Sequence, residues 1–189
     1  HCNTLQLSNE MFEDDDSRLP VLRTTVSILG AALKGESWAG IHFAPYSIMY
    51  PMRNVVAASS DRDKSLLCEC GLVGHLLFLL SGSSVAYKNE ESMAFALDVS
   101  ESLCSSREVQ TSMRSGGMVQ ALRALVKRPK FHAGAMRVLD ALLAGHIAVW
   151  MGQHRNLGAG SPLHLLDEFV IGMILDHAFG ANVLSTSPR

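Results

Sequence analysis

One segment of this chain occurs twice, 46 positions apart: Cys70–Leu80 (CGLVGHLLFLL) returns as Gly116–Val126 (GGMVQALRALV). A fixed recurrence of about 40–47 residues is typical of helical repeats, whose units bury their apolar faces only by stacking on neighbours. The spacing therefore predicts an array of stacked helical units. Such an array offers an extended surface for binding and no obvious enclosed pocket for chemistry.

The recurrence also predicts which side chains share a core. Apolar residues fall at the same five places in both copies, at spacings that put them on one face of a helix. The matched pairs are Leu72 with Met118, Val73 with Val119, Leu76 with Leu122, Leu79 with Leu125, and Leu80 with Val126. We therefore expect Leu76 and Leu122 to occupy equivalent places in successive layers.

Each copy divides into three helical pieces. In the first unit, residues 61–105, the expected helices are Arg62–Glu69, Leu72–Leu80 and Glu90–Leu103. In the second unit, residues 106–150, they are Glu108–Arg114, Met118–Val126 and Phe131–Leu143. The breaks carry Gly, Ser or Pro, which are the residues that short helix–helix connections require.

Residues 1–60 are interpreted as a degenerate repeat or cap. A helix is expected to start at about Ser17–Pro20 and to end near Lys34, because Leu22, Val26 and Leu29 form one helical stripe. The stretch 36–51 contains two prolines and most of the local aromatic residues, so we expect an irregular connection there. Such a loop would either cap the first apolar face or bind a partner.

Residues 151–189 are interpreted as a partial C-terminal repeat. A third copy of the pattern begins at Gly160-Ser161-Pro162. Its apolar positions, at a spacing of 44 from the second copy, are Leu163, Leu166, Phe169 and Val170. Together with the N-terminal unit, this gives an expected all-α fold of about three to four repeats.

Composition narrows the class of protein further. Hydrophobic residues make up 48% and aromatic residues 6% of the 189 residues, which suits packed helices better than sheets. The formal net charge of −2 gives no whole-domain field that would attract nucleic acid or an anionic membrane. No apolar run approaches the roughly 18 residues of a membrane helix. We expect neither nucleic acid nor membrane as a partner.

The cysteines and the first residue bear on cellular context. Four cysteines occur without CxxC pairing, and no Asn-x-Ser/Thr acceptor is present, so a reducing, cytoplasmic location is expected. The chain does not begin with Met and has no basic-then-apolar leader, so we expect it to be part of a longer polypeptide.

The sequence contains no motif for catalysis, a metal or a cofactor. The eight histidines lack HExxH spacing, and Cys68 and Cys70 would need further ligands to hold a metal. Gly158–Ser161 could offer backbone amides to a phosphate, but no Walker lysine follows, and the glycines are explained as a turn. We therefore expect no enzyme. The alternative is a helical enzyme domain that uses His177 with Asp176 or Asp167.

The pattern of a short helix, Gly, Leu/Met-Val-x-x-Leu-x-x-Leu-Leu/Val, a turn and a third helix such as Ala133–Ala144 resembles the armadillo repeat. The resemblance covers roughly residues 61–180 and implies a right-handed α-solenoid whose third helices line a groove for peptides or partner helices. Family members often carry a groove Asn near the end of the third helix. Ser102 and Ala141 stand at the corresponding positions, so an Asn ladder for a peptide backbone is absent.

The resemblance implies that partner-binding residues lie on the third helices. The polar or small positions expected there are Asp98, Glu101, Ser102, Arg137, Asp140 and Ala141. A second expected docking patch is basic and consists of Arg123, Lys127 and Arg128, with Lys130 and Arg137 nearby. Its occupant would be an acidic segment, and Glu10–Asp16 of another copy would qualify, which predicts possible self-association.

The function predicted from these features is a non-catalytic protein–protein interaction scaffold or regulatory domain of a larger intracellular protein. Its partner would bind along the solenoid surface. An alternative is a structural subunit of a large assembly, for example a cytoskeletal one, in which neighbours bury both faces of the array.

Overall fold

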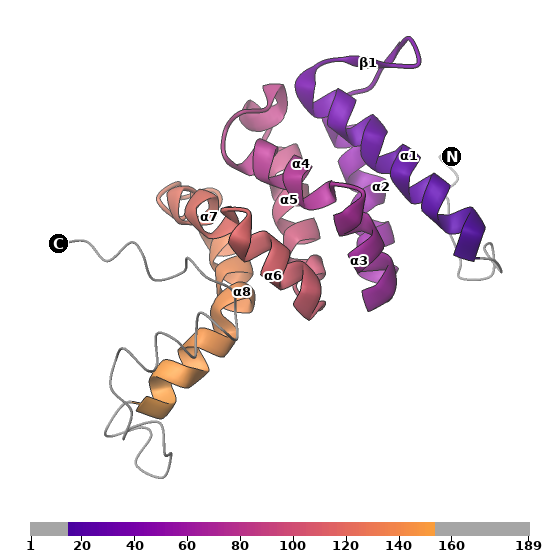
Figure 1. Cartoon of the computed structure of the whole chain (residues 1–189). Coiled ribbons are helices and arrows are strands. Elements are labelled where there is room, and N and C mark those ends of the chain that lie inside the picture. Colours follow the sequence, from indigo (N-terminus) through magenta and orange to yellow (C-terminus); the bar gives the residue numbers. More distant parts are fainter. Residues whose placement is uncertain (1–14, 154–189) are drawn as a thin grey trace.

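The computed structural model describes the backbone of residues 15–153 and the side chains of residues 19–144 (Figure 1). This part is helical apart from one small hairpin. Its elements are α1 (Asp15–Lys34), β1 (Ser37–Trp38), β2 (Ile41–His42), α2 (Pro45–Ala58), α3 (Asp61–Glu69), α4 (Leu72–Leu80), the 3₁₀ helix η2 (Val85–Lys88), α5 (Glu90–Leu103), α6 (Arg107–Ser115), α7 (Met118–Val126) and α8 (His132–Gln153). The expected all-α class is confirmed.

The repeated segment forms the same local structure twice. The expected bounds of α4, α5 and α7 agree with those observed, α3 starts one residue earlier, and α6 is one residue longer at each end. The helix α8 starts one residue later than expected and continues ten residues further, to Gln153. Gly71 and Gly117 precede α4 and α7 with φ of +94° in both cases and ψ of 10° and 12°. Residues with a Cβ rarely adopt this backbone conformation, which explains why glycine stands at both positions.

The irregular connection expected over 36–51 is wrong for its second half. Residues 37–42 form the antiparallel hairpin, but Pro45 starts α2, which continues through Pro51 to Ala58. Proline at the first helical position costs no hydrogen bond, since that N–H has no intrahelical partner. The two prolines obscured the buried stripe Met49, Met52 and Val56, which packs α2 into the core.

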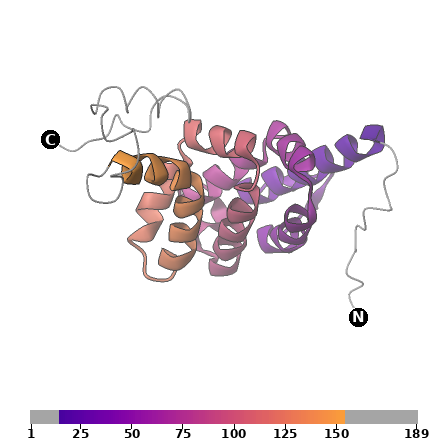
Figure 2. The ribbon, with the colours of Figure 1, turned by 90° about the horizontal axis from the view of Figure 1, so that it is seen from below.

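Helices contact one another in three rows. The first row is α3 with α6, the second is α1 with α4 and α4 with α7, and the third is α2 with α5 and α5 with α8. Figure 2 shows that chain order follows the length of the molecule, from α1 at one end to α8 at the other. Elements equivalent in sequence therefore lie side by side.

The third row repeats one burial pattern in each of its helices. Buried side chains recur at positions i, i+3 and i+7, which is one face of an α-helix. The three sets are Met49, Met52 and Val56 in α2, Met93, Ala96 and Ser100 in α5, and Ala135, Val138 and Leu142 in α8. The opposite faces of these helices are left for the surface.

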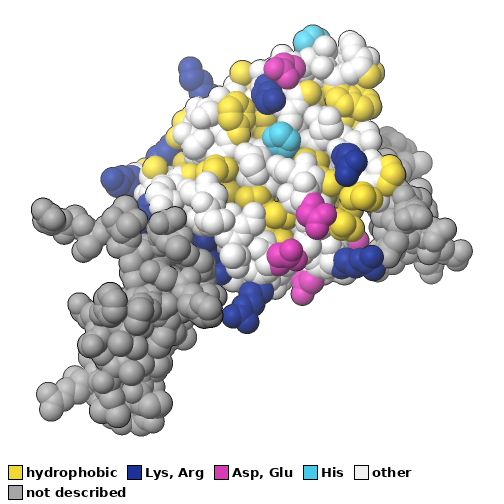
Figure 3. All heavy atoms as spheres, viewed as in Figure 1, with side chains coloured by type: hydrophobic (Ala, Val, Ile, Leu, Met, Phe, Trp, Pro, Cys, Tyr) yellow, Lys and Arg dark blue, Asp and Glu magenta, His cyan; other side chains and the backbone are white. Residues whose placement is uncertain are grey.

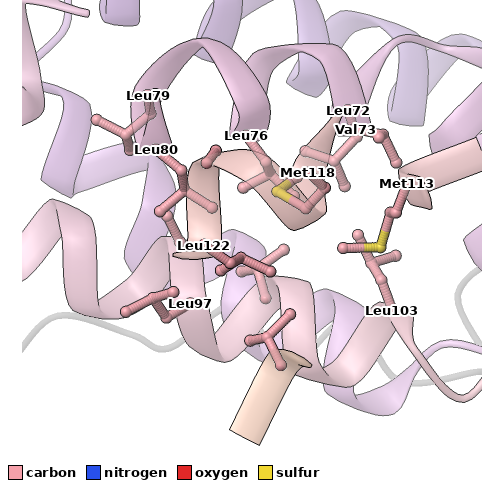
Figure 4. Packing of buried hydrophobic residues seen from close by; sticks show 14 of the residues in the cluster. Leu72, Val73, Leu76, Leu79, Leu80, Leu97, Leu103, Met113, Met118 and Leu122 are labelled. Atoms are coloured by element: carbon pink, nitrogen blue, oxygen red, sulfur yellow. The ribbon is translucent and has the colours of Figure 1, made fainter. Parts of the chain in front are cut away.

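One continuous core joins the rows. Leu76 and Leu122 are both fully buried, and both belong to the same hydrophobic cluster. Figure 4 shows α4 side chains and Met118 and Leu122 of α7 lining the same interior. Within the described residues, no strand separates the two leucines in the chain. Of the matched positions, Val126 is half-buried, whereas its counterpart Leu80 is buried.

Candidate partner-binding surface

Charged side chains form a network across all three helices of the third row. Arg53 of α2 lies 3.6 Å from Asp98 of α5. Asp98 also lies 3.4 Å from Arg137 of α8, and the Nε of Arg137 donates a hydrogen bond of 2.8 Å to Glu101. The predicted residues Asp98, Glu101 and Arg137 are thus brought together, and Arg53 extends the network to α2.

This network is open to solvent. The side chain of Arg137 is 51% exposed, and those of Asp98 and Glu101 are 36% and 39% exposed. The hydrogen bond to Glu101, and then the charge of Glu101, raise the pKa of Arg137 above its ordinary value. Exposed pairs of this kind contribute little to stability, typically below about 1 kcal/mol, so the network is better suited to recognition than to holding the fold.

Aromatic rings lie beside the charges. The rings of Tyr50 and Phe95 pack edge to face, with centroids 5.6 Å apart, and join α2 to α5. The guanidinium of Arg53 lies 5.4 Å from the Tyr50 centroid and 5.2 Å from the Phe95 centroid. Tyr46, one turn before Tyr50, is also 48% exposed. Tyr and Arg are the residue types that most often carry binding energy at protein interfaces.

A shallow groove of about 220 Å³ continues this surface between α5 and the start of α8. Its residues are Ala94, Leu97, Asp98, Lys130, Phe131, Ala133, Gly134 and Arg137. Gly134 allows the two helices to approach closely, because a Cβ there would lie 3.0 Å from Cδ1 of Leu97. At the N-terminal end of α5, Lys130 pairs with Glu90.

The other predicted third-helix residues lie near the network but not in it. Asp140 is exposed on α8, and Ser102 and Ala141 are half-buried. Their part in partner binding stays a prediction.

The three residues of the predicted basic patch are not all free to bind an acidic segment. Arg123 and Lys127 are exposed. Arg128 is instead stacked between two rings, 4.9 Å from the centroid of Tyr87 and 4.8 Å from that of Phe131. Docking of an acidic segment on the patch stays a prediction that now depends on Arg123 and Lys127. Glu10–Asp14, most of its suggested occupant, lies outside the described residues.

Metal binding and thiol chemistry depend on how the described His, Cys, Asp and Glu side chains are placed and buried. Over the described residues, no group of three or more His, Cys, Asp or Glu side chains is placed to hold a metal. Cys104 is buried, and burial, followed by the charge of Glu101, raises the pKa of its thiol to about 12. This shift disfavours the thiolate, which is the form that binds metals and reacts.

Several sequence hypotheses fall outside the described residues. These are the third copy of the repeat, the glycine turn at 158–161, and the alternative catalytic residues Asp167, Asp176 and His177. Among the helices that are described, none combines the length and the apolar character that crossing a membrane demands.

Sequence reasoning missed the contribution of α2 to the surface. The sequence placed Tyr50 in a loop that would cap the core or bind a partner, not on a helix beside α5, and it did not single out Arg53. The signal was present in the spacing of Met49, Met52 and Val56, which repeats that of Met93, Ala96 and Ser100.

The fold and the surface together define a class: an all-α array of helices in rows, with a charged and aromatic face on one row. No protein-family model, no curated protein and no solved structure matches the chain.

Proposed function

We propose that this chain is a non-catalytic protein-binding module, an α-solenoid of armadillo-like units that forms part of a larger protein. The observation that carries the proposal is the continuous charged and aromatic surface across α2, α5 and α8. Its members come from three helices far apart in the sequence, and the regular stacking of those helices supports the solenoid interpretation.

The binding mode follows from the properties of this surface. Tyr46 and Tyr50 supply partly exposed aromatic area with little conformational entropy to lose. Asp98, Glu101 and Arg137 can exchange their mutual contacts for contacts with a partner, because all three are already partly solvated. A peptide or a partner helix that lies across the three helices would meet both kinds of group.

The surface charge supports a protein partner over nucleic acid. The formal net charge is −2, and acidic and basic side chains are interspersed on the face that carries α1 and α4 (Figure 3). On the third row, Asp98 and Glu101 likewise lie beside basic side chains. A nucleic-acid surface would present clustered Lys and Arg without neighbouring carboxylates. The alternative of a structural subunit remains compatible with the same face being covered by a neighbour.

Affinity capture tests the proposal. The tagged full chain is used as bait in cells, and bound proteins are quantified by mass spectrometry for the wild type and for the double variant Tyr50→Ala/Arg137→Ala. We expect a specific set of proteins to be lost by at least about tenfold, the effect of roughly 1.4 kcal/mol. The matched control, Thr24→Ala/Gln120→Ala, changes exposed residues on the second row and should retain them. Equal capture by both double variants would contradict the proposal.

A further inference from the structure

Lys64 of α3 is a buried cation without an ionic partner. It is only 7% exposed, and its Nζ donates a 2.7 Å hydrogen bond to the neutral hydroxyl of Ser105. Among the described residues Lys64 forms no salt bridge. The hydroxyl of Ser105 in turn donates a 3.2 Å hydrogen bond to the carboxylate of Asp61. Buried ammonium groups normally pair directly with an anion, because desolvating an unpaired charge is costly.

The matched position in the next unit carries no charge. The position 46 residues later is occupied by Gln110, a neutral residue, in the equivalent helix α6. The Gln110 side chain donates to the backbone carbonyl of Cys104 at the same junction between units. Gln110 reaches back to the linker before its own helix, whereas Lys64 reaches forward to the linker before α6, so the contact of Lys64 with Ser105 belongs to the first unit.

The Ser105 hydroxyl, which accepts the hydrogen bond from Lys64, also lies next to the N-terminus of α6, and this N-terminus has no side-chain cap. At α3, Ser60 and Asp63 form a capping box that closes the N-terminus. The equivalent residues of α6 are Ser106 and Val109; the Ser106 side chain makes no capping bond, and Val109 has no carboxylate to return one. The first N–H groups of a helix have no intrahelical partner, and they attract negative charge. Ser105, the residue before Ser106, is exposed.

We propose that Ser105 is a phosphorylation site whose phosphate is held by Lys64 and by the start of α6. A protein kinase would transfer the γ-phosphoryl group of ATP to Oγ of Ser105, forming the O–P bond and releasing ADP and the hydroxyl proton. The product carries about −1.5 to −2 charges and three acceptor oxygens, which suit an ammonium and backbone N–H groups.

The neighbouring carboxylates do not prevent this arrangement. Asp61 loses the hydrogen bond from Ser105, but its side chain is exposed and can turn into water. Glu108 is occupied by the Ser65 hydroxyl at 2.7 Å. Lys64, in contrast, is buried and already directed at Oγ of Ser105. The phosphate therefore gives the buried ammonium of Lys64 an anionic partner, and it links α3 to α6.

Phosphoserine placed at position 105 of the full chain by codon suppression tests whether Lys64 and the start of α6 hold the phosphate. The readout is ³¹P NMR. The second pKa of the phosphate, about 6 when free, should fall by on the order of one unit beside Lys64. In the Lys64→Gln background it should return towards 6, and in Lys64→Arg it should stay low. Phosphoserine at exposed Ser115, at the other end of α6, is the matched control and should show no such fall. Equal pKa values at 105 and 115, or a value at 105 that Lys64→Gln leaves unchanged, would overturn the proposal.

The acceptor itself is tested with the unmodified protein. The folded chain is incubated with ATP and an extract of the cells that make it, and phosphopeptides are mapped. We expect phosphate on Ser105, lost in Ser105→Ala and retained in Ser106→Ala. No phosphate on Ser105 in the wild type, or incorporation unchanged by Ser105→Ala, would overturn the assignment.

Discussion

At the scale of single residues, two glycines show most directly that the repeat is structural. Gly71 and Gly117 begin α4 and α7 with nearly identical backbone angles, both in the left-handed region. No atom lies within 4 Å of where a Cβ at Gly71 would be, so the cost of a side chain there is a backbone cost and not a clash. The same turn therefore starts the second helix of both units.

The substitution Gly71→Ala should lower the free energy of unfolding by about 1 kcal/mol, because alanine is strained in the left-handed region. Gly74→Ala is the matched control three residues later. Gly74 is exposed inside α4, with open space around its Cβ direction, so alanine there should raise the free energy of unfolding by about 0.5–1 kcal/mol. Urea denaturation measures both values. Changes of the same sign would contradict the described start of α4.

His75 should make stability depend on pH. Its ring lies against Gly30 of α1, and burial, followed by the charge of Lys34, lowers its pKa below the ordinary value of 6.5. The folded state thus favours the neutral ring, whereas the unfolded chain takes up a proton near pH 6.5. The stabilising contribution is present above this pH and is lost as the pH falls towards the folded pKa.

Urea denaturation at pH 7.5 and pH 5 checks this expectation. The free energy of unfolding should fall between the two pH values, and it should fall less in His75→Gln. His42 is exposed and serves as the matched control, so His42→Gln should keep the wild-type dependence. A variant His75→Gln that loses as much stability as the wild type would show that His75 is not the group responsible.

At the scale of elements, the sequence predicted the helices where the pattern is clean and failed where packing overrides it. Three helices have the expected bounds because glycine and serine breaks delimit a strong apolar stripe. The first half of α2 was missed because two prolines in 14 residues favour a loop, whereas burial of Met49, Met52 and Val56 stabilises the helix. Local chemistry alone does not reveal that tertiary contribution.

The candidate surface was predictable in part for the same reason. Asp98, Glu101 and Arg137 lie on helices that the repeat placed correctly, so their meeting could be expected. Tyr50 and Arg53 required knowing that α2 packs beside α5. The stacking of Arg128 between Tyr87 and Phe131 depends on the path of a turn and of η2, and no periodic pattern in the sequence encodes that path.

Equivalent leucines in α4 and α7 should contribute similarly to stability. Leu76 and Leu122 are both fully buried, so Leu76→Ala and Leu122→Ala should each cost about 2–5 kcal/mol in thermal or urea unfolding. The control Gln120→Ala, on the exposed side of α7, should change stability by less than about 0.5 kcal/mol. If either leucine variant matched the control, that leucine would not belong to the shared core.

At the scale of the whole molecule, the helices stack in three rows. The outer face of the third row, α2, α5 and α8, therefore runs along the length of the array. The buried positions i, i+3 and i+7 of α2, α5 and α8 hold this row against the core, and the opposite faces carry the rings and the charges. A surface assembled from successive units is wide enough for an extended partner. The proposed phosphate at Ser105 would act on a different row, at the contact between α3 and α6.

The proposed function requires a protein partner to cover the third row. Hydrogen exchange with mass spectrometry, on the full chain alone and in complex with a partner obtained by affinity capture, tests it most directly. We expect slower exchange on binding in peptides from α2, α5 and the first half of α8, and little change in α3 and α6. Protection concentrated on α3 and α6, with α2 and α5 unchanged, would contradict the proposed function.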